Sequence, residues 1–361
     1  MEFYYYGIGF IAACVLAVIL TPAVKRFAFF VGAVDKPNQR KVHTRIMPRL
    51  GGLAVFLAFV GAFFVIAPMT DDLNWRVSSA LLIGGSMIVL VGALDDRFDL
   101  SPKTKLLVEI LAALVIVFYG DIQIDLVNLP FGTEFETKWL SAPLTIFWIV
   151  GVTNAVNLID GLDGLAAGVS GIANATMLVM AIMMGNVTVI LFSALLLGSI
   201  IGFLFYNFHP AKIFMGDSGA LFLGFCLATL SVLGFKQATL VSFIVPILIL
   251  GVPLSDTFFA IVRRKVNKLP ISVADKNHLH HCLLQMGFGH RKTVLVIYGI
   301  SIFFGLCAVL MSQTSQWVAL VFVAVILFVL QLGAEAIGIV SKGKRPVLNL
   351  FLRARSKNVT K

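Results

Sequence analysis

Charged side chains are scarce in this sequence: Asp, Glu, Lys and Arg together make up 13% of its 361 residues. An average soluble domain carries about 25% charged residues and about 45–50% apolar ones. Here the apolar residues reach 59%, and the polar stretches between apolar runs are too short to build a core of their own. These shortages exclude a separate soluble domain and predict one integral membrane domain over residues 1–361.

Cysteine is also scarce, with four residues and no CxxC pair. Cys14, Cys226 and Cys307 fall in apolar runs, and Cys282 is alone in a polar segment. This spacing excludes a disulfide framework and a cysteine-based zinc site. The chain also has no Walker A, GxSxG or kinase signature. No Lys or Arg precedes the first apolar run, which we predict is retained as a helix rather than cleaved.

Long apolar runs, by contrast, are abundant. A helix that crosses a bilayer needs about 20 consecutive apolar residues. The fold class predicted on this basis is an all-α polytopic membrane protein with about 11 spans. They lie at approximately 3–24, 51–69, 78–94, 104–120, 141–157, 164–184, 187–206, 218–234, 238–262, 293–311 and 317–340.

Basic residues are distributed unequally between the two sets of connections. Of the 28 Lys and Arg residues, all but Arg76, Lys138 and Lys236 fall on one set. The positive-inside rule makes that set cytoplasmic, with the N-terminus outside and the C-terminus inside. This topology signal, with a basic tail over 341–361 facing anionic lipid, accounts for the net charge of +10 without a nucleic-acid partner.

The acidic residues and histidines follow the same asymmetry. All six histidines and most aspartates fall on the predicted cytoplasmic side. A transporter would place ionisable groups near the bilayer midplane, where this chain offers only Glu109 and Glu335. The asymmetry favours an enzyme that joins a soluble substrate to a lipid one. A transporter or flippase for a lipid-linked or anionic solute is the alternative from another class.

The predicted outer loop 121–140 alternates apolar and polar residues around a Leu-Pro-Phe-Gly turn. That pattern predicts a short β-hairpin on the outer surface.

The first candidate motif is the pair Asp95-Asp96, at the predicted end of the third span. Adjacent carboxylates repel each other unless a cation shares them, and carboxylate oxygens are ligands that suit Mg²⁺. The alternative is a solvated helix end. Lys103, just downstream, is placed to meet a phosphate or a base edge.

The second motif places Asn154, Asn157, Asp160 and Asp163 at intervals of three in an apolar stretch. Glycines between and after them allow close backbone approach, and the next helix start attracts phosphate. A glycine-rich turn with aspartate caps is the alternative, but it does not explain the asparagines.

Two further sites follow in the chain. Asp217 sits where a helix N-cap belongs, so it is either a cap or a metal ligand. Phe214 is either a core residue or a stacking partner for a nucleobase. The segment before the second span ends in Pro48 and Gly51-Gly52, which we interpret as a candidate anion cradle at a helix start.

The longest predicted cytoplasmic loop, 263–292, carries His278, His280 and His281. Their spacing does not match HExxH, so phosphate binding or proton transfer is favoured over a zinc cluster. Arg263 and Arg264 at the start of the loop are possible bidentate phosphate binders. We expect this loop to contribute to substrate recognition.

Together, the segments MPRLGG, DD, NAVNLIDGLDGL, FMGDSG and HLHH resemble the polyprenyl-phosphate N-acetylhexosamine-1-phosphate transferase family over essentially the whole chain. The resemblance implies transfer of a sugar 1-phosphate from a UDP-sugar to undecaprenyl phosphate, with release of UMP. It implies Mg²⁺ as the cofactor, with Mn²⁺ as an alternative, and an active site on the cytoplasmic face of the bacterial cell membrane. A homodimer is implied by the resemblance alone.

The resemblance also implies roles for individual residues. Asp217 is similar to the principal metal ligand, and Asp95 and Asp96 to a pair that engages the metal or activates the lipid phosphate. Asn157 and Asp160 match polar residues of the phosphate site, and His280 and His281 match the histidine motif. The nucleotide-binding positions are Lys103, Asn154, Gly161, Leu162, Asp163 and Phe214. The candidates for phosphate or sugar binding are Arg45, His278, Arg263 and Arg264.

Two departures from the peptidoglycan branch of the family indicate the donor. That branch has three consecutive histidines where this chain has His278-Leu-His280-His281, and a TPTMGG-like segment where this chain has MPRLGG with Arg45 nearby. Both departures resemble the N-acetylglucosamine branch, with teichoic acid initiation the most similar. UDP-N-acetylglucosamine is therefore the expected donor. UDP-N-acetylmuramoyl-pentapeptide and other UDP-N-acetylhexosamines are the alternatives.

The residues leave the mechanism open between direct attack of the lipid phosphate and a covalent aspartyl intermediate. A CDP-alcohol phosphotransferase is disfavoured, because its DGxxAR core is absent. Glu109, Asp256 and Glu335 receive no role from the sequence.

Overall fold

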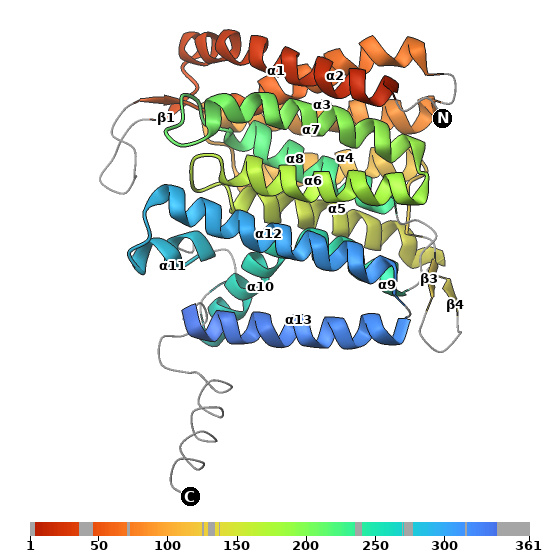
Figure 1. The fold of residues 1–361 in the computed structure, drawn as a ribbon. Coiled ribbons are helices and arrows are strands. Elements are labelled where there is room, and N and C mark those ends of the chain that lie inside the picture. Colours follow the sequence, from red (N-terminus) through yellow and green to blue (C-terminus); the bar gives the residue numbers. More distant parts are fainter. Residues whose placement is uncertain are drawn as a thin grey trace, which may run out of the picture.

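The computed structural model describes residues 4–35, 46–70, 73–124, 126–128, 134–136, 138–234, 240–268, 270, 277–314 and 316–337. Most of its helices run side by side in a common direction, so that the connections gather at two ends of one bundle (Figure 1). The strand β1 (Val34–Asp35) and the helix α11 (Leu279–Gln285) mark one end, and the strands β3 (Leu126–Asn128) and β4 (Glu134–Glu136) mark the other.

The first part of the chain supplies five helices and three short turns. They are α1 (Tyr4–Val31), α2 (Gly51–Ile66), η1 (Ala67–Met69), α3 (Trp75–Phe98), α4 (Pro102–Leu114), the π-helical turn η2 (Val115–Tyr119), η3 (Lys138–Leu140) and α5 (Ser141–Leu158). The starts of α3 and α4 follow from their caps: the side chains of Asn74 and Ser101 accept hydrogen bonds from Val77 N and Thr104 N.

The second part supplies the remaining helices. They are α6 (Leu165–Met184), α7 (Val187–Asn207), α8 (Gly216–Gly234), α9 (Leu240–Ile249), α10 (Gly251–Val266), α11 (Leu279–Gln285), α12 (His290–Ser312) and α13 (Gln316–Ile337). Within the described residues, eight helices are long and apolar enough to cross a membrane. The chain is therefore an all-α, multi-pass membrane protein, as its composition predicts. The total of eleven spans and their orientation stay predictions.

Two small antiparallel pairs accompany the helices. β3 (Leu126–Asn128) pairs with β4 (Glu134–Glu136), which confirms the hairpin predicted within 121–140. β1 (Val34–Asp35) pairs with β2 (Met47–Pro48) at the other end of the bundle (Figure 1). This second pair could not be predicted from the sequence, because strands of two residues are too short to show an alternating pattern.

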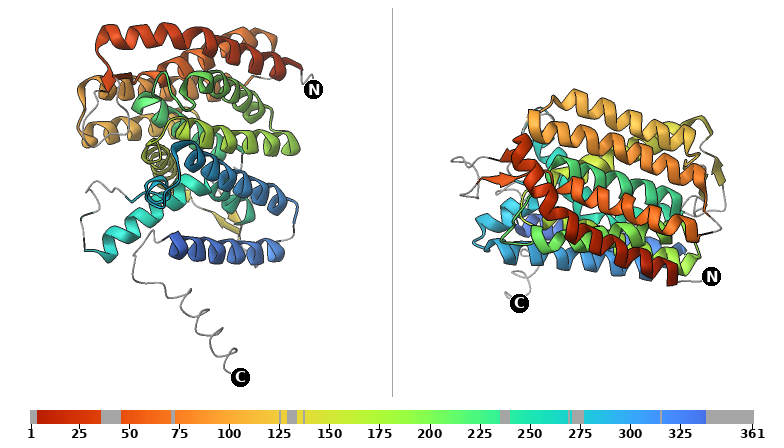
Figure 2. Two further views of the ribbon diagram at one scale, coloured as in Figure 1. Left: turned by 60° about the vertical axis from the view of Figure 1, so that its left-hand side comes forward. Right: turned by 90° about the horizontal axis from the view of Figure 1, so that it is seen from above.

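The prediction of one helix over 238–262 is wrong, because two helices meet there at Leu250. Pro253 has no amide hydrogen, so it cannot donate to the carbonyl of Ile249 and continue the helix. Gly251 at the same point removes a side chain that would favour a helix. As a result α10 runs obliquely to the other helices (Figure 2) while packing against α5 and α12.

Helix α8 lies at the centre of the fold and packs against α2, α3 and α5. Glycines make this approach possible. A Cβ on Gly52 of α2 would lie 1.9 Å from the backbone nitrogen of Gly219, and one on Gly92 of α3 would lie 2.5 Å from the Cα of Ser218. The N-terminus of α8, which carries Asp217, is therefore held in backbone contact between α2 and α3.

Candidate active site

Four helix ends meet at the end of the bundle that carries β1 and α11 (Figure 1). There α3 and α5 end while α4 and α8 begin, and α8 packs against both α3 and α5. Each of these helix ends carries one of the motifs that the sequence singled out. The fold therefore brings segments that are distant in the sequence to one place.

Lys105 lies at the centre of this meeting point. Its Nζ is 2.7 Å from Oδ2 of Asp217 and 3.1 Å from Oδ2 of Asp95, so one ammonium bridges two carboxylates from different helices. Asn157 donates a further hydrogen bond to Asp217 Oδ2 at 3.3 Å. The three charged side chains are 12–20% exposed, so the cluster is accessible from outside. Sequence reasoning missed Lys105, because it was counted at the start of an apolar span.

This cluster fits a divalent cation. Asp95 and Asp217 provide carboxylate oxygens, the ligand type that Mg²⁺ prefers. Two carboxylates that converge repel each other unless a positive charge lies between them, and here the ammonium of Lys105 provides it. Asp95 and Asp217 are the carboxylates that this geometry offers to Mg²⁺, and metal binding by them stays a prediction.

Asp96 has a different environment from the first carboxylate of the pair. Its side chain is fully buried and accepts hydrogen bonds from the amides of Asp217 (2.9 Å) and Ser218 (3.1 Å). It therefore caps α8 and orients the backbone on which Asp217 sits. Arg49 Nε lies 4.0 Å away. A glycine is required at position 216, next to Asp96, for two reasons. Its φ is 70°, and a Cβ there would lie 2.4 Å from Asp96 Oδ2. Asp96 as a metal ligand stays a prediction.

Asp160 lies in the turn between α5 and α6. Burial, followed by the negative charges of Asp217 and Asp96, raises the pKa of its carboxyl to about 8. The Asp160 carboxyl is therefore largely protonated at neutral pH in this structure, chiefly because it is buried. Its role in the phosphate site stays a prediction.

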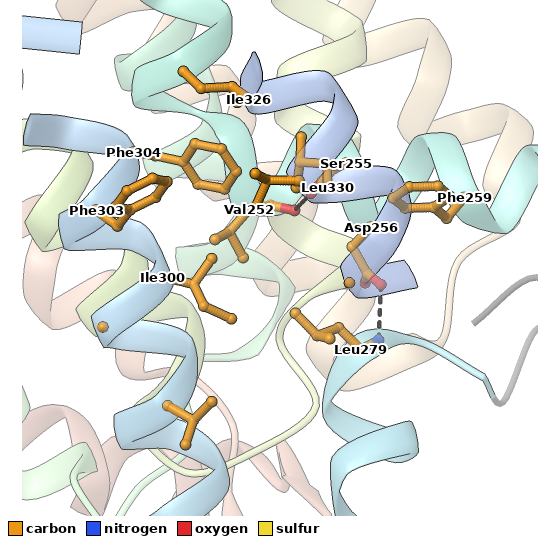
Figure 3. A pocket seen from close by; sticks show the side chains of 14 residues that line it. Val252, Ser255, Asp256, Phe259, Leu279, Ile300, Phe303, Phe304, Ile326 and Leu330 are labelled. Carbon is orange, nitrogen blue, oxygen red and sulfur yellow. Dashed lines mark hydrogen bonds between the residues drawn. The ribbon is translucent and has the colours of Figure 1, made fainter. Parts of the chain in front are cut away.

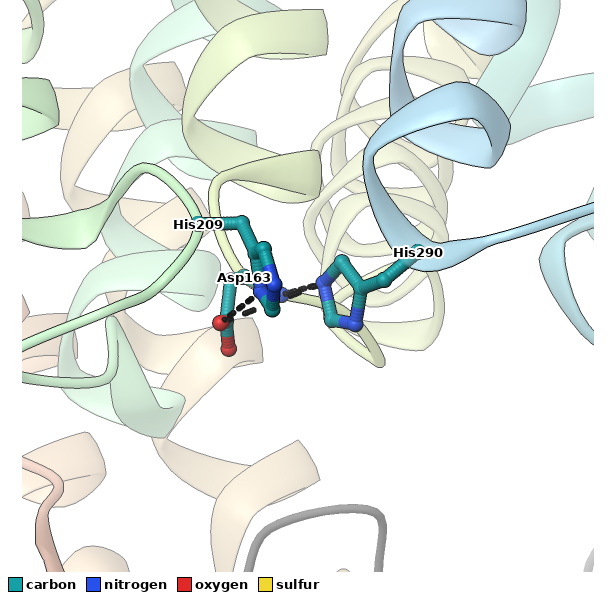
Figure 4. Close-up of side chains that lie close together, drawn as sticks. All are labelled: Asp163, His209 and His290. Atoms are coloured by element: carbon teal, nitrogen blue, oxygen red, sulfur yellow. Dashed lines mark hydrogen bonds and ion pairs between the residues drawn. The ribbon is translucent and has the colours of Figure 1, made fainter.

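Asp163, in the same turn, ties three segments together (Figure 4). Its Oδ2 lies 2.8 Å from His209 Nδ1 and accepts a hydrogen bond from the amide of Ala211 at 3.1 Å. Its own amide donates to His290 Nε2 at 3.1 Å, and the rings of His209 and His290 stack with centroids 4.2 Å apart. Sequence reasoning missed both histidines, because each was isolated in the sequence.

These three side chains are close enough together to be considered as metal ligands. However, one nitrogen of each imidazole already has a partner in the group. Lone pairs of stacked rings also point side by side rather than toward one ion. We therefore interpret the contacts among Asp163, His209 and His290 as structural: they join the turn after α5, the segment after α7 and the start of α12. The nucleotide-binding role predicted for Asp163 stays a prediction.

His280 is 3% exposed and packs directly against the turn that follows α5. A Cβ on Gly161 would lie 2.4 Å from His280 Nε2, so a glycine is required at that contact. Burial, followed by His281 nearby, lowers the pKa of His280 to about 3, so its imidazole is neutral. Among the described residues its Nε2 has no hydrogen-bond partner, although it is buried. The ring of His281 lies 4.2 Å from that of His280.

Other residues predicted for the nucleotide site have varied surroundings. Asn154 donates from its amide group to the carboxylate of Glu109 and to the carbonyl of Val150. Leu162 is 6% exposed and belongs to the hydrophobic core. Phe214 is partly buried, and Lys103 is exposed on the first turn of α4. Their predicted roles in nucleotide binding stay predictions.

The predicted anion cradle at Gly51-Gly52 is wrong. These two amides donate to the carbonyls of Phe214 and Met215, at 3.0 and 2.8 Å, so they join α2 to the segment before α8. Those bonds could not be foreseen, since their acceptors lie far along the chain.

Of the three arginines predicted to bind phosphate, two lie among the described residues. Arg263 is 5% exposed, in the last turn of α10. Arg264 is partly buried, and its Nε has no partner among the described residues. Arg45 lies outside the described residues. Phosphate binding by all three stays a prediction.

Comparison with known proteins adds to this geometry. The family description "Glycosyl transferase family 4" matches residues 78–235. A "Probable undecaprenyl-phosphate N-acetylglucosaminyl 1-phosphate transferase" of Bacillus subtilis is 45% identical over 97% of this chain and 97% of its own length. The chain belongs to glycosyl transferase family 4.

Two other relatives are also similar over most of their length. An "Undecaprenyl-phosphate alpha-N-acetylglucosaminyl 1-phosphate transferase" of Thermotoga maritima is 31% identical over 87% of this chain and 94% of its own length. A "Phospho-N-acetylmuramoyl-pentapeptide-transferase" of Staphylococcus carnosus is 30% identical over 83% and 95%. The family 4 chain described here is thus a polyprenyl-phosphate N-acetylhexosamine-1-phosphate transferase, an enzyme of the phosphoglycosyl transferase class. The transporter alternative is excluded.

Proposed function

We propose that this family 4 enzyme transfers N-acetylglucosamine 1-phosphate from UDP-N-acetylglucosamine to undecaprenyl phosphate in a Mg²⁺-dependent reaction. The products are undecaprenyl-diphosphate-N-acetylglucosamine and UMP. The reaction takes place at the cytoplasmic face of the bacterial plasma membrane and initiates a cell-envelope polymer such as teichoic acid. The observation that carries the proposal is the Asp95–Lys105–Asp217 cluster at one end of an apolar helix bundle.

The place of the cluster suits the two substrates. The acceptor is a phosphate on a long isoprenoid, so it must approach from the bilayer, while the charged nucleotide sugar must approach from water. A cluster at the ends of membrane-spanning helices can be reached by the lipid from the bilayer and by the nucleotide sugar from water. Asp95 and Asp217 lie on α3 and α8, both of which are long and apolar enough to span the bilayer.

In the reaction, an oxygen of the lipid phosphate attacks the β-phosphorus of the donor. The new P–O bond forms as the bond from that phosphorus to UMP breaks, and UMP leaves with the electron pair. Phosphoryl transfer depends on in-line positioning and on neutralisation of charge. Lys105 supplies positive charge at the reacting phosphates, while Asp96 fixes the backbone of Asp217. Bound Mg²⁺ would contribute further charge neutralisation between Asp95 and Asp217.

The alternative mechanism forms a phosphosugar ester on an aspartate before the lipid attacks. Asp95 is the candidate nucleophile that the structure favours, because Asp96 already accepts two backbone hydrogen bonds. Incubation with UDP-N-acetylglucosamine alone, followed by mass spectrometry of the intact protein, separates the mechanisms. A stoichiometric adduct of N-acetylhexosamine phosphate on Asp95 would refute direct attack.

The identity of the sugar rests on similarity. The Bacillus subtilis and Thermotoga maritima relatives are named for N-acetylglucosaminyl 1-phosphate transfer, and the Bacillus protein is considerably more similar than the muramoyl-pentapeptide transferase of Staphylococcus carnosus. The test is to incubate purified enzyme and undecaprenyl phosphate with each UDP-sugar separately and to identify the lipid product by mass spectrometry. We expect product from UDP-N-acetylglucosamine. Product from UDP-N-acetylmuramoyl-pentapeptide instead would overturn the donor while leaving the reaction class intact.

A further inference from the structure

Asp256 is a buried carboxylate that the transfer chemistry does not use. It lies on α10 and is 5% exposed. Its Oδ2 is 2.7 Å from Nδ1 of His278, and its Oδ1 accepts a hydrogen bond from the amide of Leu279 at 2.8 Å. Both oxygens therefore hold the first residues of α11, and Figure 3 shows the bond that joins α10 to Leu279.

The surroundings make these bonds difficult to replace. Asp256 and Ser255 are the polar side chains on a cavity of about 390 Å³ between α10, α11, α12 and α13, which is otherwise lined by apolar residues such as Val252, Phe304 and Leu330 (Figure 3). The apolar walls offer no substitute donor, so without His278 the buried carboxylate would keep only the amide of Leu279 as a partner, on Oδ1. The position of α11 therefore depends on the hydrogen bonds that Asp256 makes to His278 and Leu279.

The residue that follows Leu279 is His280, which reaches the active-site turn. Its ring packs against Gly161, and the rings of His278 and His280 are nearly parallel, at 5°, with centroids 6.0 Å apart. The buried Nε2 of His280 has no partner within the described part of the chain. A buried and unpaired nitrogen beside the turn that follows α5 is suited to a polar group of a ligand.

We propose that Asp256 is a positioning residue. Through His278 and the amide of Leu279, it holds α11 so that Nε2 of His280 is presented beside Gly161 to the phosphosugar part of the nucleotide donor. This inference rests on the proposed function and extends it, because it assigns a role to a carboxylate on a different helix from the phosphate-binding cluster.

The first test compares variants of the full-length enzyme that differ in the anchor. Asp256→Ala and His278→Ala remove it, whereas the side-chain amide of His278→Asn places a donor where Nδ1 was. We expect both alanine variants to raise KM for UDP-N-acetylglucosamine about tenfold or more, as expected for loss of a buried hydrogen-bond partner. KM for undecaprenyl phosphate is expected to be unchanged, and His278→Asn is expected to raise KM for UDP-N-acetylglucosamine less than His278→Ala does.

The double variant Asp256→Ala/His278→Ala should be no worse than Asp256→Ala, because the contact that His278→Ala breaks is one of the two that Asp256→Ala already removes. The matched control is Asp121→Asn, an aspartate change ahead of β3 at the opposite end of the bundle (Figure 1). Equal loss in His278→Asn and His278→Ala would overturn the proposal, as would an Asp256→Ala enzyme whose KM for the donor equals that of the control. The histidine variants keep the test decisive if Asp256→Ala does not fold.

A second measurement does not depend on activity. Hydrogen–deuterium exchange of the α11 amides, 279–285, should be about tenfold faster in both alanine variants than in wild type, and unchanged in His278→Asn. Unchanged exchange in Asp256→Ala would overturn the anchoring role. If wild-type enzyme yields no lipid product, the proposed function fails separately, and the exchange rates still decide whether Asp256 anchors α11.

Discussion

Replacement of Lys105 by methionine keeps a side chain of similar length but removes the charge that bridges Asp95 and Asp217. Lys105 makes two charge-assisted contacts, at 2.7 and 3.1 Å. Each such contact contributes about 1.5–3 kcal/mol, and the partial exposure of the three side chains moves both toward the lower end. The expected loss is therefore about 3 kcal/mol of unfolding free energy when divalent cations are absent.

That loss corresponds to a decrease of Tm on the order of 5 °C for a chain of this size. The assay is thermal unfolding of purified protein in detergent with EDTA, followed by titration with Mg²⁺. Because Asp95 and Asp217 would hold Mg²⁺ in the proposed reaction, Mg²⁺ should restore more stability to Lys105→Met than to wild type. Lys292→Met, an exposed lysine on α12, is the control and should not change Tm.

The same variant should lose activity by about two orders of magnitude or more even with saturating Mg²⁺, because charge on the reacting phosphates is no longer neutralised. A Lys105→Met enzyme with wild-type turnover would refute this role of Lys105. A variant whose Tm in EDTA matched that of wild type, and which Mg²⁺ stabilised to the same extent as wild type, would refute it equally.

Two further predictions concern packing and protonation. Gly52→Ala should prevent α2 from packing against α8, because the new Cβ would lie 1.9 Å from Gly219 N. We therefore expect little monodisperse protein by size-exclusion chromatography. The control Gly299→Ala, which has open space around the new Cβ, should behave as wild type. Because the pKa of His280 is lowered to about 3 in the fold, the unfolded chain binds more protons from about pH 6.5 downward. Stability should therefore fall as pH drops through that window, and Tm of His280→Gln should fall less over the same range; identical pH dependences would contradict the buried, neutral imidazole.

Much of the fold could be predicted from local sequence patterns. Apolar run length identified the helices, and alternation identified the β3–β4 hairpin, because both signals lie within one segment. The break at Leu250 was missed even though Gly251 and Pro253 mark it, because the whole stretch is apolar enough to read as one span.

The site was predicted less completely, because its contacts join distant segments. Asp95 and Asp217 were identified by residue type and context, but that Lys105 bridges them depends on how α3, α4 and α8 pack. For the same reason the sequence did not separate Asp96, a cap for α8, from the neighbouring aspartate. It also gave no role to Asp256, whose partner lies on another element.

The most direct test of the central claim is UMP release as a function of Mg²⁺ concentration, with undecaprenyl phosphate and UDP-N-acetylglucosamine as substrates. Wild-type enzyme should release UMP only with Mg²⁺ and only when both substrates are present. Asp217→Asn, which keeps the shape of the side chain but removes its charge, should release about a hundredfold less UMP at every Mg²⁺ concentration. UMP release by wild type in EDTA, or by Asp217→Asn at the wild-type rate, would contradict the account.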